Sequence, residues 1–169
     1  MNRLHLTGLL VCVALSACNK SEPTPERSTK SATEHTPAQA DEYATLSGDK
    51  GRFTDLRGRW LLVNYWAEWC RPCIKELPEL KNFSDQYAAS AQIFAVNFDG
   101  ASGDDLREQV QKLNVLVPVL IADPAVQLGI ERPAGLPTTY VFNPEGKLVT
   151  KLEGEQTVAT LAAAIGKTP

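Results

Sequence analysis

The sequence predicts an α/β domain with a mixed central sheet and helices on both faces. Strand-like and helix-like segments alternate along residues 42–169, a length sufficient for one domain with its own hydrophobic core. A hairpin pattern follows them near the C-terminal end. Two cysteines, Cys70 and Cys73, lie where the first long strand gives way to a helix. These observations define the fold class and single out the cysteine pair.

The predicted domain begins with three strands and a long helix. A short strand pair is expected around 43–46 and 52–54. A buried strand is expected over 60–65, which is rich in apolar, β-branched and aromatic residues. Apolar side chains then recur at helical spacing over 73–88, with lysines and glutamates between them. Pro78 within this helix predicts a kink.

The middle of the domain continues the alternation. Residues 93–97 predict a second buried strand, and 104–113 carry apolar residues at amphipathic helical spacing. A short extended segment is expected at 118–121. Asp123 and Pro124 open a brief helix that ends near Leu128. Two helices and two strands are therefore expected in this part of the domain.

The C-terminal part predicts a hairpin and a closing helix. Its strands are residues 138–142 and 148–152, joined across the turn 143–146. Thr157 begins a helix that extends to about Ile165. The resulting order, β-α-β-α-β-β-α, is typical of a thioredoxin-like sandwich.

The cysteine pair predicts redox chemistry. Two cysteines three residues apart at a helix start can close a disulfide, and the first of them, Cys70, meets outward-pointing backbone N–H groups. That position favours the thiolate, which is the form that attacks disulfides. A purely structural disulfide and half of a zinc site are the alternatives. Zinc requires about four ligands, whereas no second cysteine pair accompanies Cys73, and His35 lies in the predicted linker. No metal site is expected.

The N-terminus predicts export and lipidation. Residues 1–17 carry a basic residue, an apolar stretch and small residues, as a secretory signal does. The stretch ends in Leu-Ser-Ala before Cys18, which resembles a bacterial lipobox, so cleavage before Cys18 and a lipid thioether on its sulfur are expected. Cys12 is then discarded. An ordinary signal peptide and an uncut anchor are the alternatives. A spanning helix is disfavoured because the apolar run is shorter than the ~20 residues that a bilayer needs.

Residues 18–41 predict a lipidated flexible linker, because they are polar, proline-containing and without apolar periodicity. The chain has a formal net charge of -3 and no basic stripe, so a nucleic-acid partner is not expected. Localisation on the periplasmic side of a bacterial membrane follows from the anchor. Asn19 after the lipidated cysteine favours the outer membrane under the enterobacterial rule, whereas Lys20-Ser21 resembles an inner-membrane retention signal. The choice of membrane stays open.

The chain resembles the extracytoplasmic thioredoxin-like proteins of the TlpA/ResA type over about residues 42–166. The resemblance rests on the run Asn-Tyr-Trp-Ala-Glu-Trp-Cys-Arg-Pro-Cys at 64–73, on Glu76 and Pro78, and on Gly-Leu-Pro-Thr-Thr at 135–139. The roughly 20-residue segment between the second buried strand and Pro118, with the short helix after it, matches the insertion that small cytoplasmic thioredoxins lack. The resemblance implies a thioredoxin-like fold with this insertion.

The cysteine motif itself predicts different roles for its two cysteines. Cys70 is expected to attack, helped by the helix N-terminus and by the adjacent cation of Arg71, both of which lower a thiol pKa. The family assigns the first cysteine the same role. Cys73 is expected to resolve the mixed disulfide. Pro72 is tolerated in the first helical turn and is expected to tune the pair. Arg71 as a solvated surface charge is the alternative.

Trp69, Leu136 and Pro137 are the expected substrate-binding residues. Trp69 is expected to flank the surface where clients dock, whereas Trp66 is expected in the core. The bond between Leu136 and Pro137 matches the family's cis-proline loop, and an ordinary trans proline is the alternative. Pro137 has no N–H and leaves the Cys70 sulfur open, while the Leu136 backbone can pair with a bound peptide as an added strand.

Asn64 and Glu76 distinguish this chain from cytoplasmic thioredoxins. Thioredoxins carry a buried aspartate at the place of Asn64, and an asparagine cannot replace it as a base. TlpA/ResA-type proteins place a glutamate three residues after the second cysteine, and Glu76 matches it. From the next helical turn, Glu76 is expected to relay protons for Cys73. A surface glutamate that pairs with a lysine is the alternative.

The sequence thus predicts a membrane-tethered thiol:disulfide oxidoreductase. It is expected to reduce cysteine pairs of exported proteins, with apocytochrome c, copper-delivery proteins and misoxidised enzymes as clients. Electrons are expected from a membrane thiol transporter of the DsbD or CcdA kind, with no cofactor besides the redox-active disulfide. A disulfide-forming oxidase or isomerase and a non-catalytic client-binding module are the alternatives. Peroxiredoxin chemistry is disfavoured because Ala67, not a threonine, stands three residues before Cys70.

Overall fold

The computed structural model describes residues 41–168. The predicted signal peptide, Cys18 and all of the predicted linker except Asp41 lie outside the described residues. Asp41 itself belongs to the folded domain, where its carboxylate is hydrogen-bonded to Thr54 and Arg52. No helix within 41–168 is both long and apolar enough to cross a membrane.

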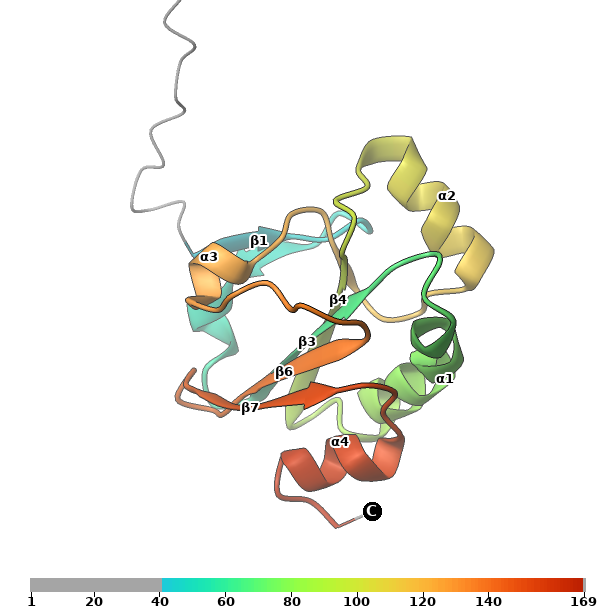
Figure 1. Cartoon of the computed structure of the whole chain (residues 1–169). Helices are drawn as coiled ribbons and strands as arrows, with labels where there is room; N and C mark the ends of the chain where they lie inside the picture. The colour runs from blue at the N-terminus through green and yellow to red at the C-terminus, as the bar shows by residue number, and fades with distance from the viewer. Residues whose placement is uncertain (1–40, 169) are drawn as a thin grey trace, which may run out of the picture. The chain divides into compact units, whose positions relative to one another are not determined.

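A five-stranded mixed sheet forms the centre of the domain, as the sequence predicts (Figure 1). The central strand β3 runs parallel to β4, which runs parallel to β5, while β6 is antiparallel to β3 and β7 is antiparallel to β6. In spatial order the strands are β5 (Val119–Leu120), β4 (Ala91–Asn97), β3 (Trp60–Trp66), β6 (Thr138–Phe142) and β7 (Leu148–Glu153). Because β3 has a partner on each side and a layer on each face, its residues after Trp60 are all buried.

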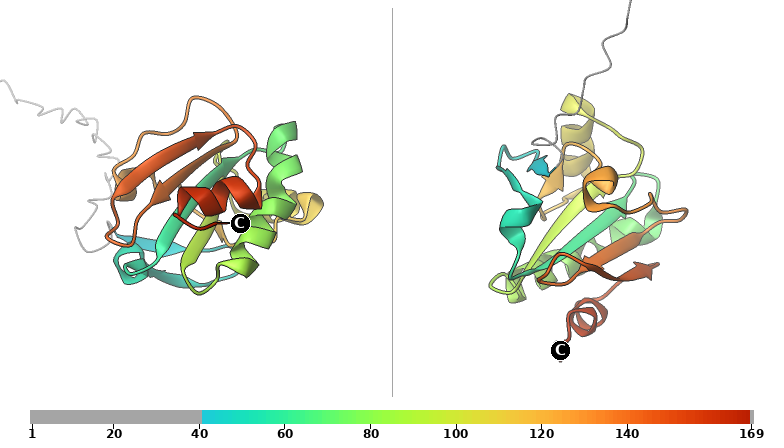
Figure 2. Two further views of the ribbon diagram at one scale, coloured as in Figure 1. Left: turned by 90° about the horizontal axis from the view of Figure 1, so that it is seen from below. Right: turned by 90° about the vertical axis from the view of Figure 1, so that its left-hand side faces the viewer.

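One face of the sheet is covered by the long helix α1 (Arg71–Gln86) and the closing helix α4 (Val158–Ala164), which lie side by side (Figures 1 and 2). The core on this face contains both redox cysteines and joins the two helices through Leu80, Phe83 and Leu161. The helix α2 (Gly103–Leu113) of the predicted insertion contributes Leu106 to the same core. Burial of these apolar side chains is the main stabilising contribution on this face.

The opposite face is covered by smaller elements. They are the hairpin strands β1 (Glu42–Ala44) and β2 (Lys50–Arg52), the 3-10 helix η1 (Phe53–Leu56) and the short helix α3 (Ala125–Leu128). An aromatic cluster of Tyr43, Phe53 and Phe94 attaches the hairpin to β4, with ring centroids 4.9 Å apart between Tyr43 and Phe94. The core of this face is thus rich in aromatic side chains, packed with Leu61, Val63, Val96 and Leu120.

The strand predicted at 52–54 is wrong in its second half, because Phe53 and Thr54 belong to η1. The carboxylate of Asp41 accepts a hydrogen bond from the Thr54 N–H, and so satisfies a donor at the start of this turn. Phe53 is buried on the core side. The other predicted strands and helices are confirmed, with boundaries that differ by at most a few residues.

Candidate active site

The site lies where β3 ends and α1 begins. Cys70 is the N-cap of α1, and Pro72 lies in the first helical turn, where its missing N–H costs no intrahelical hydrogen bond. The helix therefore starts at Arg71, two residues before the predicted start. This arrangement places both cysteines at the N-terminal end of α1, where unpaired backbone N–H groups and the helix dipole favour negative charge.

Cys70 and Cys73 form a disulfide, with the two Cα atoms 5.3 Å apart. The backbone N–H of Cys73 donates to the Cys70 sulfur at 3.3 Å. Cys70 is 4% exposed and Cys73 is 1% exposed. The donor is already aimed at the sulfur that becomes the thiolate on reduction, so the geometry suits the attacking role expected of Cys70.

Glu76 lies on the next turn of α1 and is completely buried. Its Oε1 accepts a hydrogen bond from Asn64 Nδ2 at 2.7 Å, and its Oε2 accepts one from the Gln156 backbone N–H at 2.8 Å. Burial raises the pKa of the Glu76 carboxyl to about 7, although both hydrogen bonds act to lower it. The carboxyl therefore exchanges protons near neutral pH. The alternative of a surface glutamate is wrong.

The Asn64 side chain connects Glu76 to β6. Its Nδ2 also donates to Thr139 Oγ1 at 2.9 Å, because Asn64 and Thr139 face each other in the register of β3 and β6. Both side chains are completely buried. One amide nitrogen thus joins α1, through Glu76, to the strand that follows Pro137.

The Leu136–Pro137 peptide bond is cis, as the sequence predicts. The Thr138 hydroxyl donates to the Gly135 carbonyl at 2.8 Å, and the Gly154 N–H donates to the Pro137 carbonyl at 2.9 Å. Leu136 packs against the core cluster that contains the two cysteines. The loop predicted to bind clients therefore packs on the core cluster to which both cysteines belong.

Trp69 lies on the outer side of the site and is 63% exposed, whereas Trp66 is buried in the core as expected. The Trp69 indole N–H donates to the Asp99 carboxylate at 2.8 Å, which fixes the ring against the loop after β4. An exposed, oriented indole suits the docking role predicted for Trp69. Arg71 is exposed and takes part in no ion pair with the other described residues, so its charge faces solvent beside Cys70.

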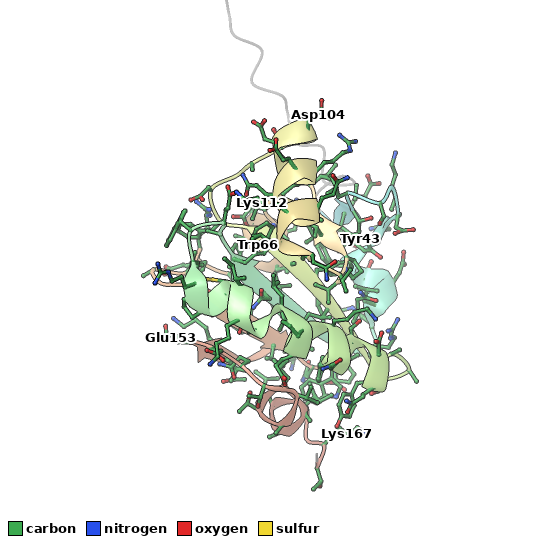
Figure 3. The ribbon with its side chains drawn as sticks, turned by 90° about the vertical axis from the view of Figure 1, so that its right-hand side faces the viewer. Tyr43, Trp66, Asp104, Lys112, Glu153 and Lys167 are labelled. Carbon is green, nitrogen blue, oxygen red and sulfur yellow. A yellow bond between two sulfur atoms is a disulfide. The ribbon has the colours of Figure 1, made fainter. Side chains whose placement is uncertain are left out.

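An ion pair connects the insertion to the site. Lys112, near the end of α2, pairs with Glu68 in the loop that precedes Cys70. In Figure 3 the Asp104 end of α2 points away from α1, and the Lys112 end points toward it. The pair is exposed, so its contribution to stability is small. It links α2 to the loop that carries Trp69.

Thr139, Gln156 and Asp99 are parts of the site that the sequence did not reveal. Thr139 belongs to the Gly-Leu-Pro-Thr-Thr motif, yet only the strand register shows that it faces Asn64. Gln156 acts through its backbone, and no side-chain pattern predicts such a contact. Within residues 41–168, no group of three or more His, Cys, Asp or Glu side chains is placed to hold a metal ion.

A redox disulfide at a helix N-terminus, a buried carboxyl one turn behind it and a cis proline directly before β6 define a thiol–disulfide oxidoreductase with a thioredoxin-like fold. The chain belongs to the AhpC/TSA family, whose model matches residues 32–151.

The chain is similar to named relatives in Bacillus. It is 32% identical over 129 residues to the thioredoxin-like protein YneN of Bacillus subtilis, with 70% of this chain and 75% of YneN covered. It is 30% identical to the thiol-disulfide oxidoreductase ResA of Bacillus cereus over 123 residues, with 72% and 70% covered. The crystal structure of StoA from Bacillus subtilis shares the fold, with a TM-score of 0.61 at 20% identity over 72% of this chain and 92% of that one.

Proposed function

We propose that this thiol–disulfide oxidoreductase is tethered to a bacterial membrane through Cys18 and reduces disulfides of exported proteins. The observation that carries the proposal is the disulfide of Cys70 and Cys73 at the start of α1, with the carboxyl of Glu76 buried one turn behind it. Each cysteine has a distinct place in the exchange, and the carboxyl supplies the proton chemistry.

The exchange runs in two steps in the reducing direction. The Cys70 thiolate attacks one sulfur of a client disulfide, which forms a mixed disulfide and releases the other client sulfur as a thiolate that takes up a proton. Cys73 then loses its proton and attacks the Cys70 sulfur, so the second client thiol leaves and the Cys70–Cys73 disulfide forms. Two electrons pass from the cysteine pair to the client.

Glu76 is the proposed proton acceptor for Cys73. A carboxyl whose pKa is about 7 is divided between its two protonation states near neutral pH, so it can take a proton in one step and return it in the next. Asn64 cannot take this role because an amide does not titrate. No cofactor besides the disulfide is required.

The direction of electron flow is tested by the reduction potential of the cysteine pair, measured in the full chain by equilibration with glutathione or dithiothreitol. A value near about -270 mV supports the reductase, because such a pair can reduce exported disulfides when it is supplied with electrons. A value near about -120 mV contradicts the proposal and supports an oxidase.

An oxidase or isomerase is the second candidate, and it is favoured by one observation. The Cys73 N–H bonded to the Cys70 sulfur and the adjacent guanidinium of Arg71 both stabilise a thiolate, and a stabilised reduced form makes a pair more oxidising. Substituting Arg71→Ala is expected to lower the potential if this cation contributes to the redox balance.

The proposed partners are exported proteins with cysteine pairs, including apocytochrome c, and a membrane thiol transporter of the DsbD or CcdA kind. Cys73→Ser leaves Cys70 able to attack and removes the residue that resolves the complex, so trapped mixed disulfides are expected to identify both partners. Cys70→Ser is the matched control and is expected to trap none. A chain that binds its clients equally well with both cysteines changed to serine is a non-catalytic module instead.

A further inference from the structure

A buried polar atom beside Glu76 has no partner. The Asn64 side chain is completely buried, and while its Nδ2 donates to two acceptors, its Oδ1 accepts no hydrogen bond within the described residues. An unsatisfied buried acceptor loses its hydrogen bonds to water without replacement and therefore destabilises the folded state. The opposite orientation of the amide exchanges the two atoms, and it is disfavoured here because the Glu76 carboxylate can only accept, whereas the Thr139 hydroxyl can also donate.

Protonation of Glu76 removes this obstacle, because a carboxylic acid can donate a hydrogen bond to the Asn64 Oδ1. Its Oε2 faces the backbone N–H of Gln156, which cannot turn away and remains a donor. An added proton is therefore expected on Oε1, which faces the Asn64 Nδ2 at 2.7 Å. While Nδ2 still donates to Oε1, the added O–H hydrogen is buried without an acceptor, and this arrangement is unfavourable.

We propose that Asn64 is a positioning residue whose amide turns over with the protonation state of Glu76, donating to the carboxylate and accepting from the carboxylic acid. In the turned state Oδ1 accepts from Glu76 Oε1–H and from the Thr139 hydroxyl, which can act as donor or acceptor. No covalent bond changes. The unpartnered atom becomes Nδ2, so each state contains one unsatisfied group, and the added O–H hydrogen of Glu76 has an acceptor in the turned state.

The turn transmits the protonation state to the client-binding side of the site. Thr139 lies on β6 two residues after Pro137, and its hydroxyl must change from acceptor to donor when the amide turns. In this way the proton that Glu76 holds during exchange alters a hydrogen bond in the strand that leads from the cis-proline loop. This transmission to the client-binding loop rests on the proposed function. The turn of the amide itself requires no client.

The groups that face Glu76 limit what else can cause a pH response. They are the amide of Asn64 from β3, the hydroxyl of Thr139 from β6 and the Gln156 backbone from the segment before α4. Glu155 in that segment raises the pKa of Glu76 through its charge and is itself paired with Lys75. On α1, Cys73 titrates only when the disulfide is reduced. The test therefore uses the oxidised protein.

The test is NMR spectroscopy of the oxidised full chain with its side-chain amides labelled with ¹⁵N. Nuclear Overhauser contacts from the Asn64 Nδ2 protons to Thr139 are expected at pH 9 and are expected to be lost at pH 5. Their loss is expected to share one midpoint with the ¹³C titration of the Glu76 carboxyl. The side-chain amide of Asn97 is the internal control and is expected to stay unchanged. It donates to Gln109 at 2.9 Å and accepts from the Ala101 N–H, and neither of these partners titrates.

Glu76→Gln provides an independent measurement. The Gln156 N–H still requires an acceptor, so the new carboxamide is expected to place its oxygen there and its NH₂ group against Asn64, as the protonated acid does. The Asn64 protons are then expected to lack the Thr139 contact at every pH. Contacts that persist from pH 9 to pH 5 in the native chain, or that remain in Glu76→Gln, overturn the inference. Neither outcome depends on the reduction potential or on any client.

Discussion

The two flanks of the Cys70–Cys73 disulfide differ in burial and in hydrogen bonding. On the inner flank, Glu76 is completely buried among fixed hydrogen-bond partners. On the outer flank, Trp69 is 63% exposed, and its indole N–H donates a hydrogen bond to the Asp99 carboxylate. Burial shifts the pKa of a carboxyl such as that of Glu76, whereas an exposed indole such as that of Trp69 offers apolar surface to a binding partner. The proposed proton transfer and the predicted client contact therefore lie on opposite sides of one bond.

The comparison also separates the expected effects of substitution. Changes on the inner flank are expected to alter the stability of the protein and the pH dependence of its reaction with every substrate, because they change the environment of a buried charge. Changes on the outer flank are expected to alter only reactions with large clients, because a small disulfide does not reach beyond the two sulfurs.

The largest effect is expected from Glu76→Gln on the pH dependence of stability. The pKa of Glu76 in the folded chain, about 7, exceeds its ordinary value of 4.5, so the native state binds the proton more tightly than the unfolded state. The free energy of unfolding therefore falls as pH rises from about 4.5 to about 7. At about 1.4 kcal/mol per pH unit, this group removes about 3 kcal/mol over that range.

Urea unfolding of the oxidised chain at several pH values measures this dependence. The difference in unfolding free energy between Glu76→Gln and the native chain is expected to rise toward pH 7 in favour of the variant. Glu155→Gln, which removes a charge outside the buried site, is the matched control and is expected to give a much shallower slope. A difference that does not vary between pH 4.5 and pH 7 contradicts the perturbed pKa.

A smaller effect is expected from Trp69→Ala on client binding. Loss of an exposed aromatic contact costs more than about 1 kcal/mol when it anchors an interface, so the KM for a folded disulfide client is expected to rise about fivefold or more. The rate with glutathione disulfide is expected to stay the same. Steady-state kinetics with both substrates measure the ratio, and an equal loss for the two places Trp69 in the exchange chemistry instead.

The smallest effect is expected from Asp99, through its hydrogen bond to the Trp69 indole. Asp99→Asn retains an acceptor and is expected to leave the client KM close to that of the native chain. Asp99→Ala removes the acceptor, and an exposed hydrogen bond of this kind contributes about 0.5–1.5 kcal/mol, so a few-fold rise in KM is expected. The indole Nε1–H signal of Trp69 is expected to shift in Asp99→Ala. Equal KM values for Asp99→Asn and Asp99→Ala indicate that client binding does not depend on the hydrogen bond that orients the Trp69 ring.

The elements of the domain could be predicted because their patterns are local. The apolar run of β3, the helical period of α1 and the turn of the β6–β7 hairpin each occupy one short stretch of sequence, and the structure confirms them. The strand predicted through Phe53 and Thr54 failed because the Asp41 carboxylate, 13 residues away from Thr54, stabilises a 3-10 turn there. A contact at that distance leaves no local pattern.

The sequence by itself determined the thiol chemistry, because two cysteines and a proline at a helix start carry their consequences within four residues. It also placed Glu76 one turn behind them, since helical spacing is fixed. Only the tertiary structure decided the burial, the hydrogen-bond partners and the pKa of that carboxyl. The register between β3 and β6 brings Asn64 opposite Thr139, and the segment before α4 brings the Gln156 N–H against the remaining oxygen. Burial and hydrogen bonding set a pKa, and both depend on residues that are distant in the chain.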